Sequence, residues 1–277
     1  MKFKYLGTAA AEVVPALWCT CDTCRKCRQN GGKDIRRRAS YLIDDDTMVD
    51  FGPDANWQVR EFGIDLSAIK RLLITHPHED HLDPVEFMWR RPGFSVVENT
   101  VKVFGSHAVA CTIMETVSRC FNSYDMKSLK IDFHPLGHGS DVTDDDMRIV
   151  ALTANHAPGK GALFYAVSRG GKTVLIGNDT GIPSEAVWSI LETMKFDMVS
   201  LDCTMAFAEP DCANGHMGVN AVLKFADRLR NAGCLNPGCR VIATHFSHNG
   251  RPLQSDLEAF FVPHQIEVAY DGMTVEI

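Results

Sequence analysis

The feature that most constrains this chain is a run of metal-binding residue types directly after an apolar strand pattern. Residues 75–82 read T-H-P-H-E-D-H-L and follow the apolar run Leu72-Leu73-Ile74. Burying several histidine and aspartate side chains without a partner would carry a large desolvation cost. A divalent cation supplies that partner, because neutral imidazole and carboxylate groups are standard ligands of zinc and similar metals. The run predicts a metal site at a strand end; the alternative is a solvated, charge-rich loop.

The same arrangement recurs at three other apolar segments. Residues 149–154, 173–176 and 240–243 are each followed, within three positions, by a potential metal ligand: His156, Asp179 and His245. In α/β proteins the edge where strands end is where sites assemble, because the strands are rigid and the loops beyond them are free to specialise. We therefore expect one shared site. The candidate ligands are His76, His78, Asp80, His81, His156, Asp179 and His245.

Composition fits an α/β enzyme of one domain spanning residues 1–277. The apolar content of 45% and charged content of 23% are ordinary for a soluble protein. A formal net charge of −7 argues against bulk nucleic-acid binding, which calls for basic faces. It does not exclude a small phosphorylated substrate, because bound metals invert the local field.

Targeting signals and cysteine usage favour the cytoplasm. Residues 1–11 are too short and polar for a secretory signal, and the chain has no apolar run of about 18 residues, so we expect no membrane association. Four of the ten cysteines crowd between positions 19 and 27. In a chain without an export signal, such crowding favours metal binding over disulfides.

Apolar periodicity predicts alternating strands and helices. Helical spacing covers residues 184–194, with Ser184 as N-cap, and residues 219–229, with Gly233 as the stop. Strands are expected over residues 3–6, 39–43, 47–51, 71–74, 101–104, 149–154, 162–168, 173–176, 198–201, 240–243 and 266–270.

Four segments between these elements have a less regular pattern. Residues 44–46 and 141–146 are expected to be acidic turns. The basic run at residues 36–38 is expected to be a solvated face, with at most one arginine turned inward. Residues 87–130 admit a helical insertion near the mouth of the site, which the sequence does not settle.

The histidine run resembles the H-x-H-x-D-H motif of the metallo-β-lactamase superfamily, met here by His76, His78, Asp80 and His81. The resemblance implies an αβ/βα four-layer sandwich of two mixed sheets flanked by helices. It also implies that His76, His78 and His156 hold one metal. Asp80, His81 and His245 would hold a second metal, with Asp179 bridging the two. An aspartate at this bridging position is typical of the phosphodiesterase-like branch of the superfamily.

A second metal site is predicted near the N-terminus. Cys19, Cys21 and Cys24 supply three thiolates, enough to bind zinc once a fourth ligand arrives. Both Cys27 and His248 are candidates for that place. The C-x-C-x-x-C loop with a T-H-x-S-H run resembles the phosphoribosyl cyclic phosphodiesterase family of the carbon–phosphorus lyase pathway. That resemblance implies a structural zinc held by the three cysteines and His248, within a zinc-binding loop at about residues 19–27.

The same resemblance extends to Gly215-His216-Met217-Gly218. In that family a histidine at the equivalent place assists phosphate-ester cleavage. Asp80 and His216 are therefore the expected catalytic residues, with His216 as transition-state stabiliser or leaving-group acid; the alternative is a solvent-facing histidine near a helix start.

Two further observations concern the surroundings of this site. The family has Gly-rich, polar residues near its N-terminal loop where this chain has residues 8–11, T-A-A-A, so the substrate contact made there is left open. Asp50 is expected to orient a ligand histidine.

Together these expectations describe a dinuclear metal-dependent phosphodiesterase that cleaves a small, cyclic or nucleotide-like phosphodiester by a metal-bridging hydroxide. The expected cofactors are two divalent ions, zinc or manganese, and one structural zinc. A homodimer is an open expectation. Three alternatives remain: a tRNA 3′-end processing endonuclease, a pyrroloquinoline-quinone biosynthesis-type protein and a non-enzymatic zinc-binding module.

Overall fold

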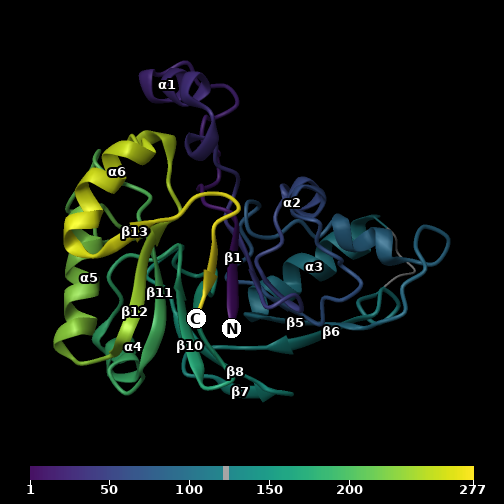
Figure 1. The fold of residues 1–277 in the computed structure, drawn as a ribbon. Coiled ribbons are helices and arrows are strands. Elements are labelled where there is room, and N and C mark those ends of the chain that lie inside the picture. The colour runs from purple at the N-terminus through teal and green to yellow at the C-terminus, as the bar shows by residue number, and fades with distance from the viewer. Residues whose placement is uncertain (121–124) are drawn as a thin grey trace.

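Two β-sheets packed face to face organise the molecule (Figure 1). The computed structural model describes residues 1–120 and 125–277. Within these residues each sheet has seven strands. The first sheet has the order β14-β1-β2-β3-β4-β5-β6, with β1 (Lys2–Gly7), β2 (Ser40–Ile43), β3 (Thr47–Val49), β4 (Arg71–Leu73), β5 (Val101–Gly105), β6 (Ile131–Pro135) and β14 (Thr274–Glu276). The second has the order β13-β12-β11-β10-β9-β8-β7, with β7 (Asp141–Asp144), β8 (Met147–Thr153), β9 (Leu163–Arg169), β10 (Lys172–Gly177), β11 (Phe196–Asp202), β12 (Leu235–Thr244) and β13 (Ile266–Val268).

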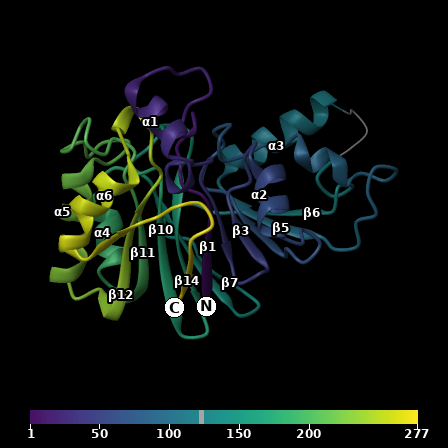
Figure 2. The same ribbon diagram turned by 45° about the horizontal axis from the view of Figure 1, so that its top comes forward.

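Alternating side chains along the strands explain why both faces of each sheet are covered. In β10, Val174 and Ile176 lie in the core between the sheets, whereas Leu175 lies in the core under the helices. Figure 2 shows helices on both outer faces. The second sheet is covered by α4 (Glu185–Leu191), α5 (Val219–Asn231) and α6 (Gln254–Phe261), and the first by α2 (Ala55–Phe62), α3 (His107–Cys120) and a 3₁₀ turn at Glu86–Arg90. The fold is the predicted αβ/βα sandwich of two mixed sheets.

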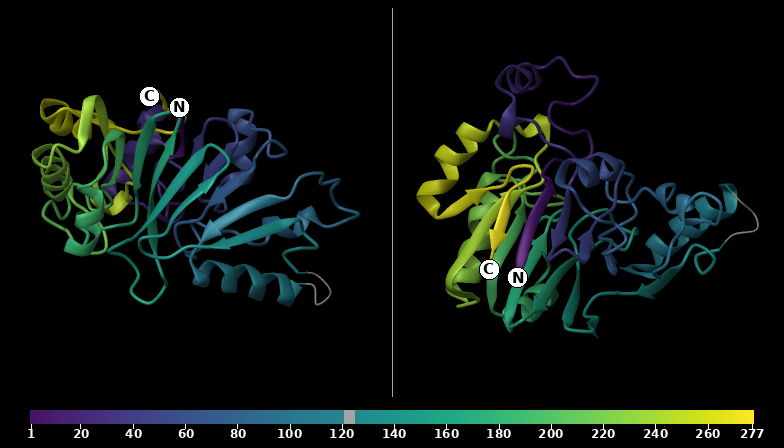
Figure 3. Two further views of the ribbon diagram at one scale, coloured as in Figure 1. Left: turned by 90° about the horizontal axis from the view of Figure 1, so that it is seen from below. Right: turned by 45° about the vertical axis from the view of Figure 1, so that its right-hand side comes forward.

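Strand direction brings many carboxyl ends to one edge. In the second sheet β8 and β10 both pair antiparallel with β9, and β10, β11 and β12 run parallel, so all four point the same way. In the first sheet β3, β4 and β5 are parallel. The loops after these strands supply the candidate site. The two chain ends lie side by side at the opposite edge, where β1 pairs with β14 (Figure 3).

The cysteine-rich segment stands apart from the two helical layers. Residues 16–31, called the cysteine arm below, contain the helix α1 (Asp22–Asn30), which projects beyond the sheets in Figures 1 and 3. Cys21 is the N-cap of this helix, because its sulfur accepts a hydrogen bond from the backbone N–H of Cys24 at 3.4 Å. Residues 22–27, two thirds of the expected loop, are therefore helical.

Two interpretations of charged segments were wrong in part. Residues 141–144 form the edge strand β7 rather than a turn, and Arg148 on β8 pairs with Asp141 across this hairpin. An edge strand tolerates charged side chains because one of its sides faces water. The basic run is only partly exposed: Arg36 is the one arginine turned inward, being 1% exposed, and it donates to Gln254 and to the carbonyl of Ala269.

Residues 87–130, which admitted a helical insertion, contain both strand and helix. The segment includes β5 and α3, and its residues 121–124 lie outside the described part of the chain. Every helix within residues 1–120 and 125–277 is too short or too polar to span a lipid bilayer.

Candidate metal centre

Five strand ends meet at the candidate centre. Asp50 follows β3, His76 follows β4, Asp179 follows β10, Asp202 ends β11 and His245 follows β12. All five side chains are buried, although their types are usually exposed. Such burial needs compensating partners within the site.

The first predicted ligand set comes together. His76, His78 and His156 each offer a ring nitrogen, and these nitrogens lie within 4.8 Å of one another. His78 Nδ1 is 2.9 Å from His76 Nε2 and 3.4 Å from His156 Nε2. Three inward-facing imidazoles at these spacings can hold one divalent cation.

The second predicted set also comes together. Asp80, His81 and His245 offer ligand atoms that lie within 4.8 Å of one another. His81 Nε2 is 3.0 Å from Asp80 Oδ2. The two imidazoles stack with their centroids 5.5 Å apart.

Asp179 lies between the two sets. Its Oδ2 is 2.5 Å from His81 Nε2 and 3.0 Å from His245 Nε2, while its Oδ1 is 3.9 Å from His156 Nε2. Its two oxygens thus face different histidines, as a bridging carboxylate requires.

Three buried atoms test whether this donor set fits a cation. His81 Nε2, His245 Nε2 and Asp179 Oδ2 are buried, and no hydrogen bond within the described residues satisfies them. Such orphaned groups are rare in folded proteins. They point at one another, and nitrogen and oxygen donors so arranged are the ligands that zinc and similar divalent metals accept. The residues fit the expected metals.

Outer partners fix the ligand histidines from β3 and β4. The Asp50 carboxylate accepts from His81 Nδ1 at 2.6 Å and from the Thr75 hydroxyl at 3.0 Å. The Thr75 oxygen in turn lies 3.0 Å from His76 Nδ1. Both rings therefore direct Nε2 inward. The structure agrees with the expected role of Asp50, whereas the contact of Thr75 with His76 was not expected from the sequence.

Residues that follow strands of the second sheet fix the orientation of the ligand histidines His156 and His245. His156 Nδ1 donates to the carbonyl of Gly215 at 3.1 Å. His245 Nδ1 lies 2.9 Å from the hydroxyl oxygen of Thr204 and 3.4 Å from Asp202 Oδ2. Asp202 was missed, although it directly follows the expected strand at residues 198–201 and the strand-end rule could have found it.

His216 joins the centre through Asp202. Its Nδ1 is 3.0 Å from Asp202 Oδ2, and its ring centroid is 4.8 Å from that of His156. Asp202 also accepts from the backbone N–H of Met217 at 2.9 Å, which fixes the loop that carries His216. This histidine is therefore not the solvent-facing side chain of the alternative interpretation; its side chain is 26% exposed.

The surroundings shift the pKa values of two ligand histidines in opposite directions. Burial acts to lower the pKa of His81, but the nearby carboxylates of Asp179, Asp50 and Asp80 outweigh it and hold the pKa well above its usual value. Burial and the neighbouring His81 lower the pKa of His76. A cation would replace the protons that balance these carboxylates, so metal binding releases protons.

Backbone strain marks the same residues. Asp50, Asp179 and His245 have φ values of 60°, 49° and 61°, which side-chain-bearing residues adopt rarely. Each such conformation costs on the order of 1–3 kcal/mol and persists only where surrounding structure holds it. Here it turns each side chain back into the centre.

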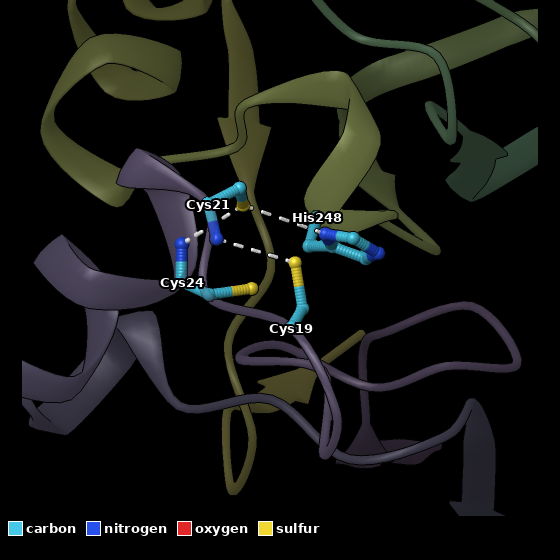
Figure 4. Close-up of side chains that lie close together, drawn as sticks. All are labelled: Cys19, Cys21, Cys24 and His248. Carbon is cyan, nitrogen blue, oxygen red and sulfur yellow. Dashed lines mark hydrogen bonds between the residues drawn. The ribbon is translucent and has the colours of Figure 1, made fainter.

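A separate cluster lies at the cysteine arm (Figure 4). Cys19, Cys21, Cys24 and His248 offer ligand atoms within 4.8 Å of one another. Cys27 is outside this group and packs against Ala9 and Val14 instead.

The thiols of this cluster differ in acidity. Burial works against ionisation of Cys21, but hydrogen bonds from the Cys24 N–H and from His248 lower its pKa to about 6. Burial raises the pKa of Cys24 to about 12.

An αβ/βα sandwich with two sets of candidate metal ligands at its strand ends, joined by Asp179, is the architecture of a metal-dependent hydrolase. The chain belongs to the metallo-β-lactamase superfamily, because the family model described as beta-lactamase superfamily domain matches residues 43–246. No sequence among the curated proteins matches it significantly.

Solved structures share the fold at low identity. Zinc-bound PqqB from Methylobacterium extorquens has a TM-score of 0.73 and 16% identity, with 100% of both chains covered. A diphosphatase from the PhnP family has a TM-score of 0.72 and 19% identity, covering 100% of this chain and 97% of the other. The short form of human tRNase Z has a TM-score of 0.69 and 17% identity, covering 100% and 99%.

Proposed function

We propose that this protein is a dinuclear metal-dependent phosphodiesterase acting on a small, cyclic or nucleotide-like phosphodiester. The observation that carries the proposal is the pair of histidine sets on either side of Asp179, with three buried ligand atoms that lack hydrogen bonds. Two of the similar structures are named as a diphosphatase and a tRNase, which supports phosphate chemistry.

In this proposal His76, His78 and His156 would hold one cation, Asp80, His81 and His245 would hold the other, and Asp179 would be a ligand shared by both. Bound divalent cations polarise phosphoryl oxygens and lower the pKa of water, which makes hydroxide available near neutral pH. Zinc and manganese are the proposed ions.

His216 is the proposed acid for the leaving oxygen. Burial lowers its pKa, but the charge of Asp202 and the hydrogen bond that this carboxylate accepts from Nδ1 outweigh burial and raise the pKa, which favours the protonated ring. Asp202 engages Nδ1, which leaves Nε2 to donate to the departing oxygen.

A structural zinc in the cluster of Cys19, Cys21, Cys24 and His248 completes the proposal. The spacing of the four ligand atoms and the low pKa of Cys21 support it, because thiolates rather than thiols bind zinc. The net charge of −7 favours a small substrate over tRNA.

The test is turnover of two phosphodiesters by metal-loaded protein: bis(p-nitrophenyl) phosphate, which has a good leaving group, and a cyclic nucleotide, which has a poor one. We expect both to be hydrolysed. His216→Ala should slow the cyclic substrate by about 10²–10⁴-fold, because general-acid catalysis is then lost. The loss should be smaller for the p-nitrophenyl diester, whose leaving group needs no proton.

The matched control is His134→Ala, which removes a partly exposed imidazole on β6 that contacts Asp132 and stacks on Phe104 and belongs to no ligand group. It should leave both rates unchanged. Equal losses on both substrates in His216→Ala would remove the acid role. No turnover of either diester by the parent protein would reject the phosphodiesterase and favour a role like that of PqqB, while activity on tRNA precursors alone would favour the endonuclease.

A further inference from the structure

The second nitrogen of His248 faces a carboxylate from the start of the chain. His248 Nδ1 lies 3.7 Å from Cys21 Sγ, whereas Nε2 lies 3.6 Å from Glu12 Oε1. The imidazole therefore stands between the thiols and Glu12, and its side chain is only 12% exposed. This is the arrangement of a metal ligand with an outer carboxylate.

Glu12 is held in place by the neighbours of His248. Its Oε1 accepts from the Ser247 hydroxyl and, at 3.2 Å, from Asn249 Nδ2. One carboxylate thus contacts three consecutive residues. Just before Glu12, Ala10 donates its backbone N–H to the carbonyl of Phe246 at 3.0 Å, which fixes the approach of the two segments.

We infer that Glu12 is the outer carboxylate of the cysteine-arm zinc site, and that it positions His248 to bind zinc through Nδ1. The inference rests on the zinc site proposed above. At 3.6 Å the contact between Glu12 and His248 is longer than a hydrogen bond, and a movement of roughly 0.6 Å brings it to the usual hydrogen-bond length of about 3.0 Å. A carboxylate that accepts from the outer N–H fixes the tautomer and makes the ligand nitrogen more basic.

Asp22 provides a matched comparison. It is a carboxylate beside the same cysteines, but its partner is Arg25 and its side chain is 83% exposed. Glu12→Gln and Asp22→Asn each remove one negative charge near the cluster, and only the first replaces the carboxylate that faces His248 by a neutral, weaker acceptor.

Cobalt(II) titration of the full chain measures the effect. Thiolate ligands give cobalt a near-ultraviolet charge-transfer band, so this band reports the cysteine cluster and not the histidine centre. We expect Glu12→Gln to bind cobalt at the cluster about 10- to 100-fold more weakly than the parent protein, and Asp22→Asn to remain close to it. Equal affinities in both variants would overturn the role of Glu12. Absence of the band in the parent protein would overturn it too, whatever the phosphodiesterase activity.

Nitrogen-15 NMR of the zinc-loaded protein gives a second, independent readout. We expect His248 to show a metal-bound Nδ1 and a protonated Nε2, with faster exchange of that proton in Glu12→Gln. A purely structural role for Glu12 would leave the tautomer and the exchange rate unchanged. Zinc bound through Nε2 would contradict the inference directly.

Discussion

The histidine centre and the cysteine cluster use the fold in opposite ways. In the centre, the seven ligands come from four segments of the chain, and four of them, His76, His81, Asp179 and His245, are buried. Each of the four histidines His76, His81, His156 and His245 has a second partner on its outer nitrogen. The cluster takes three of its four ligands from one short stretch, and Cys21 is exposed. Two sheets position the ligands of the histidine centre, whereas one helix N-terminus and one loop position those of the cysteine cluster.

Because of this difference, we expect the histidine centre to be preorganised and the cysteine cluster to assemble when metal binds. The sheets hold the centre in place before any metal binds, and they maintain strained backbone at Asp50, Asp179 and His245. The cysteine arm has few apolar contacts of its own: its buried Cys27 packs with Ala9 and Val14, while Trp18 is 96% exposed. We therefore expect the arm, and not the sandwich, to depend on metal for its order.

The largest expected effect is at Asp179. Asp179→Asn should remove the bridge between the two sets, because its Oδ2 faces His81 and His245 while its Oδ1 faces His156. Metal content should fall at both positions, and kcat/KM should fall by about 10³-fold or more, or ~4 kcal/mol. Elemental analysis and steady-state kinetics measure these quantities. Asp83→Asn is the control, since Asp83 lies outside every ligand group. Full occupancy of both metal positions in Asp179→Asn would contradict the bridge.

The sequence predicted the strands that carry the ligands of the histidine centre better than the loop hydroxyl and backbone groups that orient those ligands. His76 and Asp179 were found because a short apolar run precedes each of them. Thr75, Thr204 and the carbonyl of Gly215 were missed because hydroxyl and backbone groups carry no pattern; only the folded loops bring them to imidazoles.

Burial of charged residues was harder still to predict. Arg36 looked solvated within its basic run, yet its partners, Thr8, Gln254 and Ala269, come from both ends of the chain. Periodicity along one segment cannot reveal contacts between residues more than two hundred positions apart.

A smaller effect is expected at the base of the cysteine arm. Asp271 accepts from the Thr8 hydroxyl and from the backbone N–H of Arg37, each at 2.8 Å. Burial raises its pKa from 3.8 to about 6, despite these hydrogen bonds and the nearby arginines. The folded state therefore binds this proton more tightly than the unfolded state. Its stabilising contribution is complete below about pH 4 and is lost as the pH rises to about 6.

Asp271→Asn should remove this dependence, since the amide does not titrate. The difference in unfolding free energy between variant and parent should change by at most ~3 kcal/mol across that window, because one pKa unit is worth about 1.4 kcal/mol. Urea unfolding of the metal-free protein at a series of pH values measures it. Asp45→Asn, at an exposed turn, controls for the loss of one charge. Parallel profiles for Asp271→Asn and the parent would show that Asp271 has no such role.

The smallest effect on catalysis is expected from the cysteine cluster. Cys21→Ser removes an exposed sulfur that also caps α1, so the arm should lose its zinc and become cleavable by trypsin at Arg25 and Lys26. The centre should keep its metals, because its ligands are fixed by both sheets. The segment from His245 to His248 links the two sites along the chain, and such coupling is typically worth about 0.5–2 kcal/mol, or roughly 2- to 30-fold in kcat/KM.

Cys120→Ser, an exposed cysteine outside the cluster, is the control for this substitution. Metal analysis should show one equivalent fewer in Cys21→Ser and no change in Cys120→Ser. If Cys21→Ser instead lost the histidine-centre metals together with the arm zinc, the two regions would form a single cooperative site. The sheets would then not be sufficient to preorganise the centre, because the position of His245 would depend on the metal that holds His248.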